Sequence, residues 1–203
     1  LRVISEKASK RNAKYAFNTA IQRNQKNRVT CVHKSNVMRK TDGLFAKSCE
    51  SIANEFPNVK FDQMYVDACS MNLIRQPQEF DVIVTTNLFG DILSDESSQV
   101  VGGLGMAPAA NLGDNFGLFE PVHGAAFDIA GKQIANPTSF ILSIKMMLEW
   151  LGRKNNDQNS ITAAQTLEKT VIRVIEAGIT TKDVGGNMST REFTKEITNR
   201  LVL

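Results

Sequence analysis

The chain has 203 residues, of which 42% are hydrophobic and 22% are charged, and this composition predicts a globular fold with a sizeable core. Its net charge of +3 is small and dispersed, which argues against nucleic acid binding, and no apolar run is long enough to span a bilayer. The chain has an odd number of cysteines, and no two of them have CxxC spacing: Cys31, Cys49 and Cys69. Reduced thiols in the cytoplasm are therefore the simplest expectation.

Hydrophobic periodicity predicts alternating helices and strands over the first hundred residues. Residues 1–23 are expected to form one long helix or two short ones, and further helices are expected at 42–56, 68–76 and 91–101. Strands are expected at 28–33, 59–65 and 81–86. Asp42 is placed to cap the second of these helices. Strands that alternate with helices in this way favour an α/β fold.

The second half of the chain has fewer strand signals. Residues 102–117 hold five glycines and one proline and are expected to form an ordered loop, followed by a short strand at 116–119. Pro137 opens a predicted helix that should stop at Gly152. A further helix is expected at 157–177, and the capping-box spacing of Ser189 and Glu192 predicts a last helix.

Asp91 and Asp95 are the most informative pair of residues in the chain. They lie in NLFGDILSD, directly after the apolar stretch at 81–86. Side chains four residues apart on a helix are about 5–6 Å apart at Cβ. Two carboxylates so close repel each other unless a cation lies between them, and Mg²⁺ or Mn²⁺ prefers oxygen ligands. The alternative is a solvated pair in the first turns of a helix, stabilised by the helix dipole.

Three further segments carry residues of chemical interest. Lys34 follows a predicted strand in VHKSNVM, Asp67 lies in VDA, and EPVHGAAFDIAG spans residues 120–131, before Asn136. Taken alone, Lys34 would be an ordinary surface lysine and Asp67 a helix cap. The glycines of Gly102-Gly103-Leu104-Gly105 do not open a helix after a strand, so they are not a dinucleotide-binding fingerprint.

Together these segments resemble the β-decarboxylating dehydrogenases, the family of isocitrate, 3-isopropylmalate and homoisocitrate dehydrogenases. The resemblance covers the whole chain and is nearest to archaeal-type 3-isopropylmalate dehydrogenases, through VTCVHK, MYVDA, GDILSDE and EPVHGAAFDIAGK. It implies an isocitrate/isopropylmalate dehydrogenase-like fold with two α/β domains of non-Rossmann type. Residues 1–101 would form the domain with the metal site, the catalytic residues and the dimer interface, and residues 102–203 the C-terminal part of the larger, NAD-binding domain.

The resemblance also implies roles for individual residues in an oxidative decarboxylation that uses NAD and Mg²⁺ or Mn²⁺. The implied metal ligands are Asp67, Asp91 and Asp95, with Asp67 reaching a site of the other subunit. Lys34 and Asp67 would be catalytic, and Lys34, Asn36 and Val37 would contact the substrate. The implied cofactor-binding residues are Glu120, His123, Gly124, Ala125, Ala126, Asp128, Ile129 and Asn136. A carboxylate at Asp128 can accept hydrogen bonds from both ribose hydroxyls and would repel a 2′-phosphate, so NAD is expected rather than NADP.

The identity of the substrate stays open at this point. Family members are longer than this chain, and an expected N-terminal part would carry the specificity loop, the arginines and the catalytic tyrosine. Val37 matches a position at which isopropylmalate and homoisocitrate dehydrogenases often have valine and isocitrate dehydrogenases often have isoleucine. The overall resemblance of the quoted segments favours 3-isopropylmalate, as in leucine biosynthesis, over homoisocitrate or isocitrate. A non-catalytic regulatory subunit of an NAD-isocitrate dehydrogenase is a second alternative, although its usual losses in the signature are not seen here. The expected partners are a small 2-hydroxy di- or tricarboxylate and further copies of the chain, as a homodimer or higher even oligomer, without nucleic acid or membrane.

Overall fold

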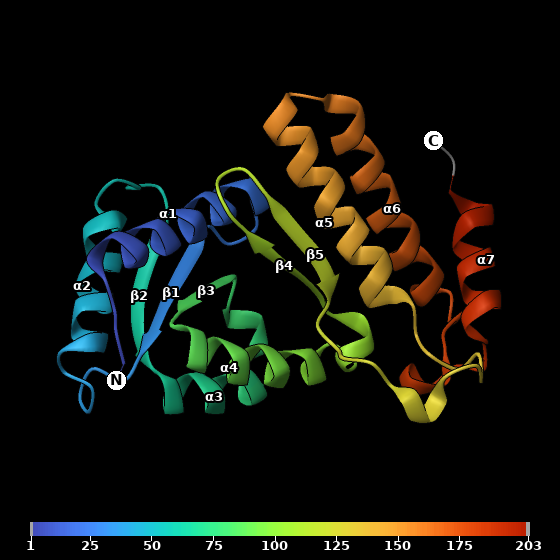
Figure 1. Ribbon diagram of the computed structural model, residues 1–203, viewed down its shortest axis with the longest axis horizontal. Helices are drawn as coiled ribbons and strands as arrows, with labels where there is room; N and C mark the ends of the chain where they lie inside the picture. Colours follow the sequence, from blue (N-terminus) through green and yellow to red (C-terminus); the bar gives the residue numbers. More distant parts are fainter. Residues whose placement is uncertain (1, 202–203) are drawn as a thin grey trace. The chain divides into compact units, whose positions relative to one another are not determined.

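Residues 2–201 are described by a computed structural model, and the chain divides into two compact units (Figure 1). The first unit is Leu1–Val100 and the second is Val101–Leu203. Helices in the described range, residues 2–201, are all too short or too polar to cross a bilayer.

A three-stranded parallel sheet forms the centre of the first unit. Its strands are β1 (Arg28–His33), β2 (Lys60–Tyr65) and β3 (Val82–Thr85), in the order β2-β1-β3. The register sets His33 beside Tyr65 and Val32 beside Thr85, so all three strands end at one edge of the sheet. The segments that follow parallel strands therefore gather at this edge, which is where open α/β sheets bind ligands.

Helices cover both faces of this sheet. They are α1 (Glu6–Arg23), α2 (Thr41–Ala53), α3 (Val66–Arg75) and α4 (Asn87–Val100). Alternate residues of β1 point to opposite faces. Cys31 packs in a cluster with Phe17 of α1 and Phe45 of α2, whereas Val32 packs with Cys69 of α3 and Leu93 of α4. The nearly continuous burial of β1 reflects this two-sided cover.

The second unit combines an antiparallel hairpin with a helical cluster. The hairpin strands are β4 (Pro108–Leu112) and β5 (Gly117–Pro121), and the helices are α5 (Thr138–Asn155), α6 (Gln158–Glu176) and α7 (Thr190–Arg200). Short 3₁₀ turns occur at η1 (Pro77–Glu79) in the first unit and at η2 (Leu104–Met106), η3 (Phe127–Ile129) and η4 (Lys182–Val184) in the second. Trp150 of α5 packs on Phe119 of β5, with ring centroids 5.9 Å apart.

The predicted start of the last helix is confirmed. Ser189 is the N-cap of α7, its side chain accepts from the Glu192 backbone N–H, and the Glu192 carboxylate accepts from the Ser189 backbone N–H. These reciprocal bonds satisfy two donors that the first helical turn would otherwise leave unpaired.

Several expected helix boundaries in the first unit were wrong, and α1 begins only at Glu6. The α2 helix runs from Thr41 to Ala53 with Lys40 as its N-cap, so Asp42 lies inside the helix and does not cap it. The α4 helix begins at Asn87, one turn before the predicted start at Asp91. Asp42 is fully buried, so its side chain lies in the interior of the unit and does not serve the helix end.

Two further expectations failed in the second unit. Residues 102–117 are not only loop, because Pro108–Leu112 forms β4 by pairing with β5. Such short strands, poor in β-branched residues, depend on their partner strand more than on local propensity. Helix α5 also runs past Gly152 to Asn155. A Cβ at Gly152 would lie 2.7 Å from Ile161 Cγ1 and 2.9 Å from the Asp157 carbonyl oxygen, so close packing explains this glycine.

Two glycine-to-alanine substitutions should therefore have opposite effects on the free energy of unfolding. Gly152→Ala should lower it by about 1–3 kcal/mol through overpacking against Ile161. Gly43→Ala, also inside a helix but with no atom within 4 Å of the added Cβ, should raise it by about 0.5–1 kcal/mol. Urea unfolding of the two variants measures both values. A stabilised Gly152→Ala protein would show that the glycine serves no packing purpose.

Candidate active site

Lys34 and Asp67 meet at the carboxyl edge of the parallel sheet. Lys34 follows β1 and Asp67 lies in the first turn of α3, directly after β2. The Lys34 ammonium donates a hydrogen bond to Asp67 Oδ1, and the two form an ion pair. This bond, followed by one from the Asp67 backbone N–H, lowers the pKa of the Asp67 carboxyl below its ordinary value. The structure thus brings together the two residues predicted to be catalytic.

His33 and Tyr65 lie behind this pair. The Lys34 Nζ atom is 5.7 Å from the centre of the Tyr65 ring, and that ring packs edge-on against the buried His33 at 5.6 Å. His33 Nδ1 accepts the Ser35 backbone N–H at 3.2 Å, so Nε2 carries the proton and donates to Gln63 Oε1 at 3.0 Å. Both nitrogens of His33 are occupied inside the protein, which suits support of the site more than chemistry.

The loop after Lys34 presents the two predicted substrate contacts to solvent. The backbone N–H groups of Val37 and Met38 both donate to the Lys34 carbonyl oxygen, at 3.0 and 2.8 Å, and close a tight turn. Asn36 is exposed, and Val37 is 69% exposed, a high value for an apolar residue. Both side chains are therefore available to a ligand.

Asp91 and Asp95 are exposed on successive turns of α4. Among residues 2–201 neither carboxylate has a hydrogen bond or ion pair, and the hydroxyls of Ser94 and Ser98 bond to their backbone oxygens instead. Because α4 begins at Asn87, both acids lie beyond its first turn, where the helix dipole falls off. The dipole therefore no longer accounts for this pair, and two free carboxylates are a fitting donor set for a hard cation.

A complete metal site is not formed within the described part of this chain. Nowhere in residues 2–201 do three His, Cys, Asp or Glu side chains gather closely enough to hold a metal ion. Asp91 and Asp95 could supply two ligands, and Asp67 of the same chain does not complete the set.

The predicted cofactor loop lies in the second unit, after β5. His123, Gly124, Ala125, Ala126 and Asp128 are exposed, and Ile129 is half-buried at the end of η3. The Asp128 carboxylate has no hydrogen-bond partner among the described residues, which leaves both oxygens open to ribose hydroxyls. Glu120 is exposed on β5 and accepts a hydrogen bond from Asn111 Nδ2 at 2.9 Å.

Asn136 behaves differently from the rest of this set. It is buried, its Nδ2 donates to Asp183 Oδ2 at 3.0 Å, and its Oδ1 accepts from the Thr138 backbone N–H at 3.0 Å. The Asn136 side chain thus binds both Thr138, the first residue of α5, and Asp183 in η4. A cofactor contact from this residue would use its backbone.

Known protein families include one that matches almost the whole chain. Residues 1–199 match the isocitrate/isopropylmalate dehydrogenase family. The chain belongs to this family. It is 54% identical over 202 residues to a 3-isopropylmalate dehydrogenase of Sulfurisphaera tokodaii, covering 99% of this chain and 59% of that protein. It is 48% identical over 198 residues to a homoisocitrate dehydrogenase of Methanocaldococcus jannaschii, covering 98% and 54% of the two chains.

A solved structure agrees with this assignment. The isocitrate dehydrogenase from Methylococcus capsulatus superposes with a TM-score of 0.89 at 44% identity, covering 99% of this chain and 58% of that one. The family and the non-Rossmann fold expected from the sequence are thereby confirmed. The chain spans somewhat more than half the length of the relatives it matches.

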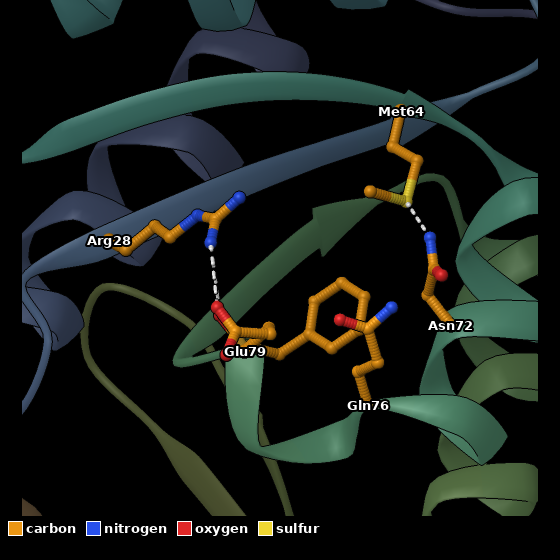
Figure 2. Close-up of a pocket in the computed structure, with 6 residues that line it drawn as sticks. Arg28, Met64, Asn72, Gln76 and Glu79 are labelled. Atoms are coloured by element: carbon orange, nitrogen blue, oxygen red, sulfur yellow. Dashed lines mark hydrogen bonds and ion pairs between the residues drawn. The ribbon is translucent and has the colours of Figure 1, made fainter.

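A small cavity elsewhere in the first unit is not part of the site. Its volume is about 180 Å³, and it is lined by Arg28, Met64, Asn72, Gln76, Glu79 and Phe80 (Figure 2). Arg28 pairs with Asp62 at 2.8 Å and bonds the Glu79 carbonyl at 3.2 Å, while Asn72 donates to Met64 Sδ at 3.6 Å. Most of its polar side chains are already engaged within the protein, and ligand pockets are usually larger, at about 300–1,000 Å³.

Proposed function

We propose that the whole protein catalyses the NAD-dependent oxidative decarboxylation of a 3-substituted malate, with 3-isopropylmalate as the substrate. The observation that carries this proposal is the Lys34–Asp67 ion pair at the ligand-binding edge of the sheet, in a chain of this family. The name of the Sulfurisphaera relative supports isopropylmalate. The name of the Methanocaldococcus relative, only slightly less similar, favours homoisocitrate as the second candidate.

The candidate residues of this chain would have distinct roles in the proposed reaction. When bound, NAD accepts hydride from the substrate and the divalent ion polarises its oxygen atoms. Lys34 Nζ, after its ammonium has released a proton to solvent, would accept the proton of the substrate hydroxyl, and the Asp67 carboxylate would hold that amine at the sheet edge. Asn36 and Val37, exposed beside it, orient the substrate. Asp91 and Asp95 would supply two oxygen ligands to Mg²⁺ or Mn²⁺.

The proposed metal site calls for a homodimer, since residues 2–201 of one chain do not gather three ligands. A two-fold axis that brings Asp67 of one subunit to Asp91 and Asp95 of the other would form two equivalent sites. Apolar residues exposed on α3 and α4 support an interface there: Met71, Ile74, Ile92 and Val100. Burial of such side chains stabilises a dimer by about 25 cal/mol per Å².

A cytoplasmic location is supported by the thiols. Cys31, Cys49 and Cys69 are buried and unbridged. Burial raises the pKa of Cys69 to about 11, so its thiol is protonated and unreactive at neutral pH. Unpaired, unreactive cysteines are typical of proteins from a reducing compartment.

The assay that tests this function uses the whole protein with NAD and Mn²⁺. Reduction of NAD is followed with 3-isopropylmalate, homoisocitrate, isocitrate and malate, and the highest kcat/KM is expected for 3-isopropylmalate. A higher kcat/KM for homoisocitrate would make homoisocitrate the substrate and leave the proposed oxidative decarboxylation unchanged. No turnover of any of these acids, with the protein folded, would favour a non-catalytic regulatory subunit.

Coenzyme preference should depend on Asp128. The wild-type protein should prefer NAD, because the free Asp128 carboxylate would repel the 2′-phosphate of NADP. Asp128→Lys combined with Ile129→Tyr should move the ratio of kcat/KM values toward NADP by about 100-fold or more, since it removes a repulsion and adds a cation. Asp114→Lys, at another exposed aspartate of the second unit, is the control. A wild-type protein that already prefers NADP would contradict the argument from Asp128.

A further inference from the structure

Asp42 is a fully buried carboxylate next to the Lys34 loop. Its relative exposure is 0%, and its Oδ2 accepts the Lys34 backbone N–H at 2.7 Å. Its Oδ1 pairs with the Arg2 guanidinium at 2.9 Å. A buried charge is costly unless it is paired and hydrogen-bonded, and an apolar residue would often stabilise the fold as well. The bond to Lys34 therefore suggests a purpose beyond folding.

The loop that carries Lys34 is held by several such bonds. The Lys34 N–H is bound by Asp42, and the next N–H, of Ser35, by His33 Nδ1. The Asp42 N–H donates in turn to the Met38 carbonyl at 2.9 Å. A backbone tied at consecutive positions leaves the Lys34 side chain little freedom at its base.

Arg2 extends this network to the start of the helix with the metal-binding candidates. It donates to Thr86 Oγ1 at 2.9 Å and lies 5.5 Å from the centre of the Phe89 ring. Thr86 and Phe89 flank Asn87, the first residue of α4. One arginine thus contacts both the anchor of the Lys34 loop and the base of the helix with Asp91 and Asp95.

We infer that Asp42, held by Arg2, is a positioning residue that fixes Lys34 for proton transfer. The inference rests on the function proposed above. It needs no contact between Asp42 and the substrate, because the effect passes through the Lys34 backbone N–H. A misplacement of about 1 Å in a reacting group can lower the rate about 100-fold.

Asp81 provides a matched control within the same unit. Its side chain is 1% exposed, it pairs with Arg23 at 3.0 Å, and it accepts the Arg28 backbone N–H at 3.4 Å. Arg28 is the first residue of β1, whereas Lys34 follows the last. Asp42 and Asp81 therefore make the same kind of bonds at opposite ends of one strand, and only Asp42 is beside the site.

The test compares Asp42→Ala with Asp81→Ala in the whole protein. Both variants should lower the urea midpoint, but only Asp42→Ala should lower kcat, by about 100-fold, with the KM for NAD unchanged within about threefold. Only Asp42→Ala should speed amide hydrogen exchange at Lys34. Asp42→Asn keeps an oxygen that can accept the Lys34 N–H and should restore kcat to within about tenfold of wild type. If Asp42→Ala does not fold, Arg2→Met against Arg23→Met takes its place, with an expected loss of about tenfold in kcat for Arg2→Met alone.

Three results would overturn the inference: an unchanged kcat in Asp42→Ala, an equal loss in Asp81→Ala, or unchanged exchange at the Lys34 amide. An equal loss in both arginine variants would do the same. A wild-type protein without turnover of any tested acid would instead refute the proposed function, while the exchange comparison would still decide whether Asp42 anchors the loop.

Discussion

Replacement of Lys34 with methionine is expected to lower kcat by about 10²–10⁴-fold, the usual contribution of a positioned acid–base group. Methionine keeps much of the length of the side chain but cannot accept or donate the hydroxyl proton. The Lys34–Asp67 pair is partly exposed, so its loss should change the free energy of unfolding little. The fall in kcat should therefore appear in a folded protein.

Steady-state kinetics at saturating NAD, Mn²⁺ and substrate measure this effect. Lys40→Met is the control, because Lys40 is exposed at the end of the same loop and has no ion pair among residues 2–201. Lys40→Met should match the wild type. A Lys34→Met protein that keeps kcat within about threefold of the wild-type value would show that Lys34 takes no part in the proton transfer.

Replacement of Asp95 with asparagine is expected to raise the Mn²⁺ concentration needed for half-maximal activity by about 100-fold or more, since the site loses one of its charged oxygen ligands. Asp114→Asn, at an exposed aspartate outside the site, should leave it unchanged. An Asp95→Asn protein with the metal dependence of the wild type would show that Asp95 of α4 is not a metal ligand.

The two variants together test whether the site is shared between subunits. If Lys34 and Asp67 of one subunit act with Asp91 and Asp95 of the other, a mixed Lys34→Met and Asp95→Asn dimer contains one intact site and one doubly damaged site. Random reassociation makes half of the dimers mixed, so the mixture should recover about one quarter of the wild-type activity. Each variant alone should stay nearly inactive at limiting Mn²⁺.

Native gel electrophoresis of the mixture shows whether the subunits have exchanged, because Lys34→Met removes a positive charge and Asp95→Asn removes a negative one, so the mixed dimer migrates between the two parent dimers. Recovery that rises as exchange proceeds would support the shared site. A mixture in which subunits exchange without any recovery would mean that each site carries one lesion. Lys34 and Asp95 of a site would then belong to the same subunit, which would contradict the proposed two-fold arrangement.

Much of this protein can be read from local sequence. The patterns of residues 28–33 and 59–65 predicted strands, and Ser189 with Glu192 predicted a helix start, because each signal rests on neighbours a few residues apart. The NLFGDILSD string and the His123–Gly131 loop pointed to the family, which the comparisons confirmed. The roles of Asp91, Asp95 and Asp128 remain predictions from that resemblance.

Other features depend on contacts between distant parts of the chain. The pairing of Lys34 with Asp67, 33 residues apart, follows from the parallel register of β1 and β2. The bond from Asn136 to Asp183 spans 47 residues and buries a side chain that the sequence placed in an exposed cofactor loop, and its role toward the cofactor stays a prediction. Asp42 illustrates the limit most clearly, because its position predicted a helix cap while its complete burial beside Arg2 and Lys34 gives it another role.

The physical reason is the range of each interaction. Helix and strand propensity, capping and amphipathic patterns act between residues close in sequence, so they can be predicted from the amino-acid sequence alone. Burial, the pairing of β4 with β5 and the close packing at Gly152 arise only when separate elements come together. The sequence by itself therefore determined the family, most elements and the candidate residues, and the tertiary structure decided which side chains are free to react and which hold the others in place.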